Sequence, residues 1–320
     1  MANCWVIRSP LPLKLFNSIE SAAQDGSLSG AAAALGNFDG VHLGHRALLR
    51  AAAALGRAGV VTFQPHPGKV LQPDLAPKLI STYERKLELL AEAGATFAVV
   101  QPFSADFART GAGAFEEQLF DHLKLKAVVV GSDFTYGSKR SGNVAALAAA
   151  AGKRGAKVQV VEQVVLEGVV VSSSKVREYI LEGRVEAAER LLSRPFDLDG
   201  TVVKGAARGR TIGFPTANID TDNELKPAPG VYAVRVRRQP GGSWHGAAAN
   251  IGVKPTFGGT EVTIEAHLLD FSGDLYGQAL RVQFLARLRP EMRFGSVAEL
   301  TAQIKRDVER AREAVARVGN

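Results

Sequence analysis

The spacing of hydrophobic positions changes along this chain. Up to about residue 192, short continuous apolar runs alternate with stretches of helical period, as expected for strands buried on both faces of a parallel sheet. The expected strands are 31–35, 59–63, 96–101 and 127–130, and the expected helices include 43–55, 83–93 and 174–192. This alternation predicts an α/β doubly wound domain.

From residue 198 onward the apolar runs are short and rich in β-branched residues, with Gly/Pro loops between them. They lie at 201–203, 231–237, 247–251, 262–268 and 280–284. This spacing predicts an antiparallel barrel or sandwich. Ser296 and Glu299 have capping-box spacing before a long charged helix that runs towards Val318. We therefore predict two domains, residues 1–183 and 184–320.

Composition limits the possible location and partners of the protein. Lys and Arg number 39 against 32 Asp and Glu, a net charge of +7, but the basic residues are scattered and lack interleaved aromatics. This favours attraction of small phosphorylated substrates over nucleic-acid binding. No apolar run approaches the roughly 20 residues of a membrane helix, residues 1–20 lack the order of a signal peptide, and Cys4 is the single cysteine. We expect a cytoplasmic protein with no membrane partner, and its oligomeric state stays open.

Candidate chemistry begins at the turn Gly36–His45, between the first apolar run and the first helix. Amides at a helix N-terminus lack partners and the helix dipole is positive there, so His42 and His45 flanking Gly44 can meet a phosphate chain. Neither a P-loop nor a Gly-x-Gly-x-x-Gly pattern is present, so a nucleoside triphosphate would have to be held differently. Two more polar loops follow apolar runs, at 131–143 and 172–177. The three serines of the second loop alone would be compatible with simple helix capping.

The second half contains a candidate cation site. If residues 216–218 are extended, the period of two puts the Thr216 hydroxyl and the Asn218 amide oxygen on one face, where both can ligate Mg²⁺. The alternative is a Pro-Thr turn with an incidental asparagine. The preceding segment 205–213 is either a flexible surface loop or a phosphate-binding one, with backbone amides and two cations near the phosphate. Its candidate residues are Gly205, Arg208, Gly209, Arg210 and Gly213.

These motifs together resemble one family. His42-x-Gly44-His45 is similar to the signature of the nucleotidylyltransferase superfamily. Together with segments 62–67, 131–142 and 171–177, it resembles the adenylyltransferase half of the bacterial bifunctional riboflavin kinases/FMN adenylyltransferases, also called FAD synthetases. The second half independently resembles riboflavin kinases, through segments 205–218, 250–257, 264–271, 274–277 and 288–294. The resemblance covers nearly the whole chain.

The resemblance implies a nucleotidylyltransferase domain followed by a β-barrel riboflavin kinase domain with a C-terminal helix. ATP and Mg²⁺ would convert riboflavin to FMN, and a second ATP would convert FMN to FAD with release of pyrophosphate. Glu265 matches the general base of the kinase, Thr216 and Asn218 its metal ligands, and His42 and His45 the catalytic pair of the other half. The implied ATP-binding residues of the first half are Gly36, Asn37, Phe38, Gly44, Ser172, Ser173, Ser174 and Arg177, and those of its flavin loop are Asp133, Phe134 and Arg140.

Departures from the family pattern are few. Val171 and Ser174 replace the usual Ile and Thr, and Gln64 stands where Glu is common, a change that bears on metal or nucleotide affinity. His267 is expected to be structural. The alternatives are an adenylyltransferase for pantetheine phosphate or nicotinate mononucleotide fused to a barrel, and a non-enzymatic flavin sensor or nucleic-acid-binding protein. The apparently intact metal ligands and base of the kinase half argue against both.

Overall fold

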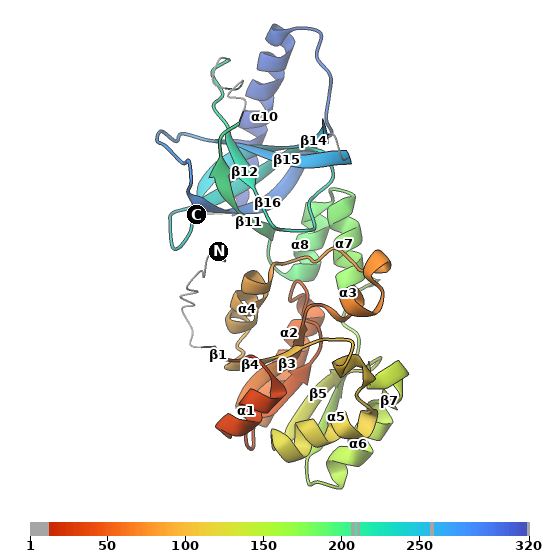
Figure 1. Ribbon diagram of the computed structural model, residues 1–320. Coiled ribbons are helices and arrows are strands. Elements are labelled where there is room, and N and C mark those ends of the chain that lie inside the picture. Colours follow the sequence, from red (N-terminus) through yellow and green to blue (C-terminus); the bar gives the residue numbers. More distant parts are fainter. Residues whose placement is uncertain (1–12, 206–208, 210–211, 257–258, 319–320) are drawn as a thin grey trace. The chain divides into compact units, whose positions relative to one another are not determined.

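The chain forms two compact units. The computed structural model describes residues 13–205, 209, 212–256 and 259–318, so Arg208 and Arg210 lie outside the described residues (Figure 1). The first unit contains residues 1–78 and 83–172, and the second contains 79–82 and 173–320. In the described part of the chain, no helix is long and apolar enough to cross a membrane.

The first unit is built on a six-stranded, all-parallel sheet with strand order β1-β4-β3-β2-β5-β8. Its strands are β1 (Lys14–Phe16), β2 (Ala32–Leu35), β3 (Ala58–Gln64), β4 (Phe97–Pro102), β5 (Ala127–Gly131) and β8 (Lys157–Val161). Crossover connections between parallel strands place helices on both faces. The predicted doubly wound sheet is therefore confirmed.

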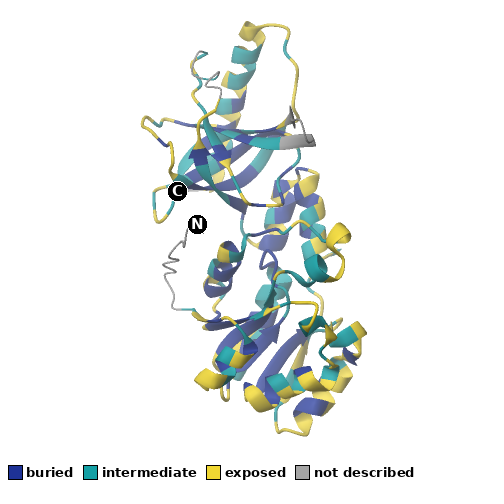
Figure 2. Ribbon diagram, viewed as in Figure 1, coloured by how far each residue is buried: buried dark blue, intermediate teal, exposed yellow. Residues whose placement is uncertain are grey.

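Burial on both faces explains the continuous apolar runs of the four central strands, β4, β3, β2 and β5. Alternate residues of β2 point into different cores: Ala33 and Leu35 belong to one, Ala32 and Ala34 to the other. The first core also takes residues from α1 (Ile19–Asp25), α5 (Ala112–Glu117) and α6 (Val144–Gly152). The second takes residues from α2 (Leu43–Leu55) and α4 (Tyr83–Glu92). Figure 2 shows the strands as the most deeply buried part of this unit.

Short elements complete the first unit. They are α3 (Pro67–Leu71), η1 (Pro73–Leu75), η2 (Phe107–Arg109), the π-helical turn η3 (Gln118–His122), β6 (Thr135–Tyr136), η4 (Ser138–Arg140), β7 (Gly142–Asn143), β9 (Val165–Leu166) and β10 (Val169–Val170). Strands β6 and β7 pair with each other inside the polar loop that follows β5. That loop therefore folds as a small hairpin at the carboxyl end of a buried strand.

The second unit begins with two helices, α7 (Ser173–Leu181) and α8 (Val185–Leu192), and continues into a closed antiparallel barrel of order β11-β12-β15-β14-β13-β16 (Figure 1). The barrel strands are β11 (Phe196–Val203), β12 (Ala217–Asp220), β13 (Gly230–Arg238), β14 (His245–Thr256), β15 (Gly259–Leu268) and β16 (Ala279–Arg289). The predicted barrel is confirmed. The predicted domain bounds 1–183 and 184–320 place α7 with the first domain, whereas it clusters with the barrel unit, and those bounds stay a prediction.

The long helix α10 (Val297–Val318) closes the chain and packs on the barrel, where its Ala311 joins Val231, Ala233 and Leu288 in one apolar cluster. Ser296 caps it by accepting the Glu299 N–H at 3.2 Å, as predicted. The Glu299 carboxylate accepts the N–H of Gly295 at 3.0 Å. This bond extends the capping box by one residue and ties the end of the preceding loop to the first turn of the helix.

Residues 79–82 belong to the second unit although the sequence around them belongs to the first. Leu79 donates its N–H to the Glu224 carboxylate at 3.0 Å, and its carbonyl accepts the Leu225 N–H at 3.3 Å. Ile80 in this segment is 1% exposed. The chain therefore contributes residues 79–82 to the second unit, returns to the first unit, and joins the second unit again at residue 173.

Candidate active sites

Three barrel strands place polar side chains next to one another in the second unit. Glu265 on β15 lies opposite Asn218 on β12 and opposite Asn250 on β14. Directly paired residues in antiparallel strands project from the same face with Cβ atoms about 5 Å apart. The strand register thus brings Asn218 and Glu265 together, as the proposed kinase chemistry requires, and adds Asn250, which the sequence analysis did not identify.

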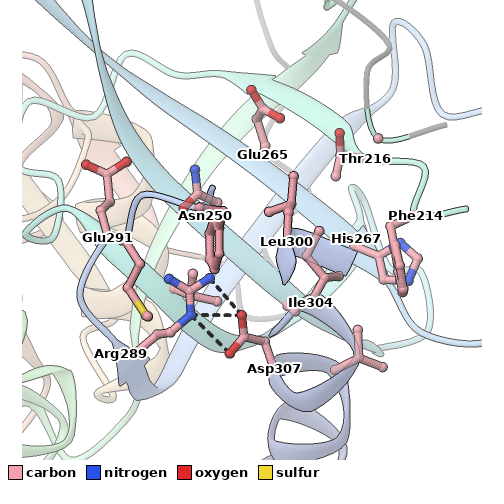
Figure 3. Close-up of a pocket in the computed structure, with 16 residues that line it drawn as sticks. Phe214, Thr216, Asn250, Glu265, His267, Arg289, Glu291, Leu300, Ile304 and Asp307 are labelled. Atoms are coloured by element: carbon pink, nitrogen blue, oxygen red, sulfur yellow. Dashed lines mark hydrogen bonds and ion pairs between the residues drawn. The ribbon is translucent and has the colours of Figure 1, made fainter. Parts of the chain in front are cut away.

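Glu265 and Thr216 line a cavity of about 330 Å³ between the barrel and α10. Ligand pockets for small molecules usually begin at about this size. Figure 3 shows Glu265 and Thr216 at one end of the cavity and the ion pair of Arg289 and Asp307 at the other. Polar groups also come from Asn250, His267 and Glu291, and apolar ones from Val231, Ala248, Met292, Phe294, Leu300, Ile304 and Val308.

The glycine-rich segment approaches the predicted metal ligands closely. A Cβ at Gly205 would lie only 2.5 Å from the Asn218 Oδ1, a distance that real Cβ atoms essentially never show. A Cβ at Gly209 would lie 3.5 Å from the Thr216 Oγ1, and Gly213 has a left-handed φ of +86°. An alanine at 205 would therefore have to displace the Asn218 side chain or shift its own backbone, and Gly205 and Gly209 lie close to Asn218 and Thr216.

Oxygen donors of the right kind for Mg²⁺ converge here. Thr216 offers a hydroxyl, Asn218 an amide oxygen and Glu265 a carboxylate, and hard cations prefer such ligands. Among the described residues, no group of three His, Cys, Asp or Glu side chains is arranged to hold a metal.

His267 supports the backbone just before β12, next to Thr216. Its Nδ1 lies 2.8 Å from the Pro215 carbonyl oxygen, which can only accept, so Nδ1 donates. Its ring also meets Phe214 edge to face, with centroids 5.4 Å apart. These contacts agree with the structural role expected for His267, although its side chain also reaches the cavity wall.

In the first unit, His42 and His45 form a stacked pair at the start of α2. Their ring centroids are 3.7 Å apart and the ring planes differ by 18°. His42 is the N-cap: its Nδ1 accepts the His45 N–H at 3.4 Å. One of the helix-terminal amides proposed to meet phosphate is thus already used by His42. The remaining polarity of this turn comes from the imidazoles and the other first-turn amides.

Gly44 separates the two imidazoles and lies close to the third predicted loop. A Cβ here would lie 3.0 Å from the His42 Cε1 and 3.7 Å from the carbonyl oxygen of Val171. The backbone just before Ser172 therefore lies beside the histidine turn. Ser173, Ser174 and Arg177 begin α7 in the second unit, and their role on the ATP phosphates stays a prediction.

The histidine turn has a strained backbone held by packing. Phe38 and Val41 have φ values of +54° and +43° and are fully buried. Positive φ is especially unfavourable for a β-branched residue, and such strain concentrates at functional sites. The carbonyl of Asn37 accepts the Thr62 hydroxyl at 3.2 Å, and the Asn37 amide lies 3.4 Å from Nε2 of His66, a residue to which the sequence assigned no role.

Lys86 is a buried cation near this turn that the sequence analysis missed. Its ammonium donates to the Phe63 carbonyl at 3.3 Å and the residue is 7% exposed. Burial lowers the pKa of Lys86 to about 8, and the nearby Asp39 carboxylate opposes that shift. Lys86 lies four residues before Leu90, on the apolar side of a predicted amphipathic helix. A lysine on that face could have been recognised from the sequence as a buried cation.

The predicted flavin loop starts beside the histidine turn, because β5 is the direct neighbour of β2. Phe134 stacks on Tyr136 with centroids 5.7 Å apart, whereas Asp133 and Arg140 are exposed. The Tyr136 hydroxyl donates to Glu116 at 2.6 Å, and burial together with that carboxylate raises the pKa of the phenol.

The two rings of the loop extend a series of aromatic contacts. Neighbouring centroids in the series are 5.7 to 6.5 Å apart, and its members are Phe63, Phe103, Phe107, Phe115, Phe134 and Tyr136. Phe63, Phe103, Phe107 and Phe134 are only partly buried. The series packs largely against the first core of this unit and reaches the predicted flavin loop at Phe134. Its residues are far apart in the sequence, and the sequence analysis picked out only Phe134.

An α/β unit with a histidine turn after β2, joined to a barrel whose cavity is lined by a carboxylate, is the arrangement expected of a two-site transferase acting on nucleotides. A model of the riboflavin kinase family matches residues 192–315, and a model of the FAD synthetase family matches residues 24–175. The chain belongs to the bifunctional riboflavin kinase/FMN adenylyltransferase family. It is therefore an enzyme with both of these activities.

Curated relatives of that name match over most of their length. The protein of Haemophilus influenzae is 39% identical over 89% of this chain and 94% of its own. The protein of Escherichia coli K12 is 38% identical over 94% and 97%, and that of Bacillus subtilis 37% identical over 87% and 90%. A crystal structure described as a macrolide-efflux protein from Streptococcus pneumoniae is 34% identical, with a TM-score of 0.83 over 94% of this chain and 99% of that one. The fold is thus shared over 94% of this chain.

Proposed function

We propose that the two activities are divided between the units, with riboflavin phosphorylation in the barrel and FMN adenylylation at the parallel sheet. The matches of the two family models to separate segments support this division. The observation that carries the kinase assignment is the position of Glu265, which is paired with Asn218 and Asn250 and lines the cavity with Thr216.

In the barrel, Glu265 is the general base. Its carboxylate accepts the proton of the riboflavin 5′-hydroxyl while that oxygen attacks the γ-phosphorus of ATP and ADP leaves. Thr216 and Asn218 would hold Mg²⁺, which would supply positive charge to stabilise the transferred phosphoryl group. Glycines 205, 209 and 213 would let backbone amides approach the phosphates, and the charges of Arg208 and Arg210, which lie outside the described residues, would neutralise them.

In the first unit, the reaction needs no covalent enzyme intermediate. A phosphate oxygen of FMN attacks the α-phosphorus of ATP, the bond to the bridging oxygen breaks, and pyrophosphate leaves with FAD as the product. Catalysis then depends on positioning and on stabilising negative charge. His42 and His45 contact the ATP phosphates, with the Gly36–Phe38 turn and the Ser172–Arg177 segment around the nucleotide. The loop with Asp133, Phe134 and Arg140 takes the flavin beside the aromatic series.

Selective variants in the full chain test this division. With riboflavin, ATP and Mg²⁺ supplied, the wild type should yield FMN and FAD. Glu265→Gln should abolish riboflavin phosphorylation yet still convert added FMN to FAD. His45→Ala should let FMN accumulate without FAD. Each variant is the folding control for the other, and an equal loss of both reactions in either variant would contradict the assignment.

A further inference from the structure

We propose that the ion pair of Arg289 and Asp307 is a positioning device that sets the affinity of the barrel cavity for riboflavin without taking part in phosphoryl transfer. The proposal rests on the proposed function, because it takes this cavity as the riboflavin site. It concerns two residues to which the sequence analysis gave no role.

The pair joins the barrel to the last helix. Arg289 is the final residue of β16, and Asp307 lies in the middle of α10. The Arg289 Nε donates to the Asp307 Oδ1 at 3.1 Å and Oδ2 at 2.9 Å, and Nη2 lies 2.8 Å from Oδ2. The side chains are only 12% and 4% exposed. Planar guanidinium-to-carboxylate contact of this kind fixes both distance and orientation.

Further contacts make the pair the centre of a larger arrangement. The Arg289 Nη1 donates to the Pro290 carbonyl at 3.0 Å, and the guanidinium lies 5.7 Å from the centroid of the Phe294 ring. On the helix, the Gln303 amide donates to the Asp307 Oδ1 at 2.9 Å. The arginine thus holds both ends of segment 290–294 next to α10.

That segment supplies three residues of the cavity wall, Glu291, Met292 and Phe294, and α10 supplies more on the same side. A shift of the segment relative to the helix would therefore change the shape of the cavity. The apolar residues beside the pair suit a flavin ring, which would leave the 5′-hydroxyl for Glu265 at the other end (Figure 3).

Two physical points favour positioning over catalysis or simple stabilisation. The charge of Arg289 is balanced by Asp307, so it is not an uncompensated cation for the transferred phosphoryl group. A buried ion pair also contributes little net stability compared with apolar residues of similar volume, because both charges lose their hydration. Its presence in the wall of a ligand cavity is better explained by the geometry that it imposes.

Steady-state kinetics of the full chain test the proposal. Asp307→Asn keeps the shape of the side chain but removes its negative charge. Arg289→Lys keeps the positive charge but removes the bidentate contact. Each should raise the KM for riboflavin at least tenfold, with kcat at saturating riboflavin and the KM for ATP within twofold of wild type. FMN adenylylation should be unchanged. A purely structural role would lower kcat with the folded fraction and leave the riboflavin KM as it was.

The chain offers a matched control. Arg281 and Asp199 form another two-pronged pair in the barrel, with both N–O distances 2.6 Å and Arg281 3% exposed, but neither residue lines the cavity. Asp199→Asn should therefore leave the riboflavin KM unchanged. If it raises that KM as much as Asp307→Asn does, the effect is a general loss of barrel order and the proposal fails.

A single substitution could prevent folding by leaving one buried charge unpaired. The double variant Arg289→Met with Asp307→Leu avoids this, because it removes both charges together. It should fold and still show the raised riboflavin KM. A wild-type riboflavin KM in any folded variant of the pair would overturn the proposal. If instead the barrel is not the riboflavin kinase site, the result is different: Glu265→Gln still phosphorylates riboflavin.

Discussion

Replacing Gly205 with alanine tests whether the glycine-rich segment must lie against the predicted metal ligand. The new methyl carbon would lie 2.5 Å from the Asn218 Oδ1, whereas ordinary contact begins at 3.4 Å. Either the Asn218 amide or the backbone at 205 must therefore move by about 1 Å. A misplacement of about 1 Å in a catalytic constellation can lower the rate on the order of 10²-fold, or about 2.7 kcal/mol of activation free energy.

The assay is riboflavin phosphorylation at several Mg²⁺ concentrations, with FMN adenylylation in the same preparation as the folding control. Gly295→Ala is the matched substitution in the same unit, because a Cβ there would meet the nearest atom, Glu299 Oε2, at 3.5 Å. Gly205→Ala should lose about a hundredfold in kinase rate and Gly295→Ala less than twofold. A wild-type kinase rate in Gly205→Ala would refute the idea that this close approach positions Asn218.

Three other changes give distinct results. Glu265→Gln should lower riboflavin phosphorylation by about 10²- to 10⁴-fold, the usual range for a general base, at every Mg²⁺ concentration measured. Gly44→Ala should slow FAD formation about tenfold, because the methyl group would lie 3.0 Å from the His42 ring; normal output of FAD would count against that turn. Burial lowers the pKa of Lys86 from its ordinary 10.5 to about 8 in the folded chain, so the unfolded chain binds more protons between these pH values. Its burial therefore lowers the unfolding free energy by about 3 kcal/mol below pH 8, and this cost fades as the pH rises to 10.5. Hydrogen exchange of α4 should show that rise in wild type but not in Lys86→Met, and equal pH profiles would disprove the charge burial.

The fold was largely predictable because its strongest signals are local. Helix α2 has the predicted bounds, since an apolar period of 3.6 lies between a strand turn and Gly56. The four central strands of the parallel sheet, β4, β3, β2 and β5, were predicted because burial on both faces makes them continuously apolar. The edge strands β1 and β8 were not predicted, because β1 has only three residues and β8 is largely exposed. Strand β12 was not among the predicted runs: it has four residues, Ala217–Asp220, and follows Pro215. Its pairing partners, not its own sequence, make it a strand.

The candidate sites were predictable as motifs but not as cavities. The extended Thr216–Asn218 pattern and Glu265 each carried a signal, yet their proximity comes from the register of β12 on β15. Asn250 opens segment 250–257, which resembles the family, but its position beside Glu265 follows only from the pairing of β14 with β15. The contact of Arg289 with Asp307 depends on where α10 packs on the barrel, which periodicity leaves undetermined.

Residues 79–82 belong to the second unit although they lie within the first half of the sequence, and this affects domain exchange between related genes. A single crossover near residue 172 would combine a barrel from one parent with a 79–82 segment from the other. The Leu79 N–H and carbonyl would then have to bond Glu224 and Leu225 of the other parent. The buried Ile80 would likewise have to pack against residues of the other parent. A barrel expressed alone from residue 173 would lack that segment altogether. The two activities can therefore be inherited separately only if a short stretch of the first half evolves together with the second.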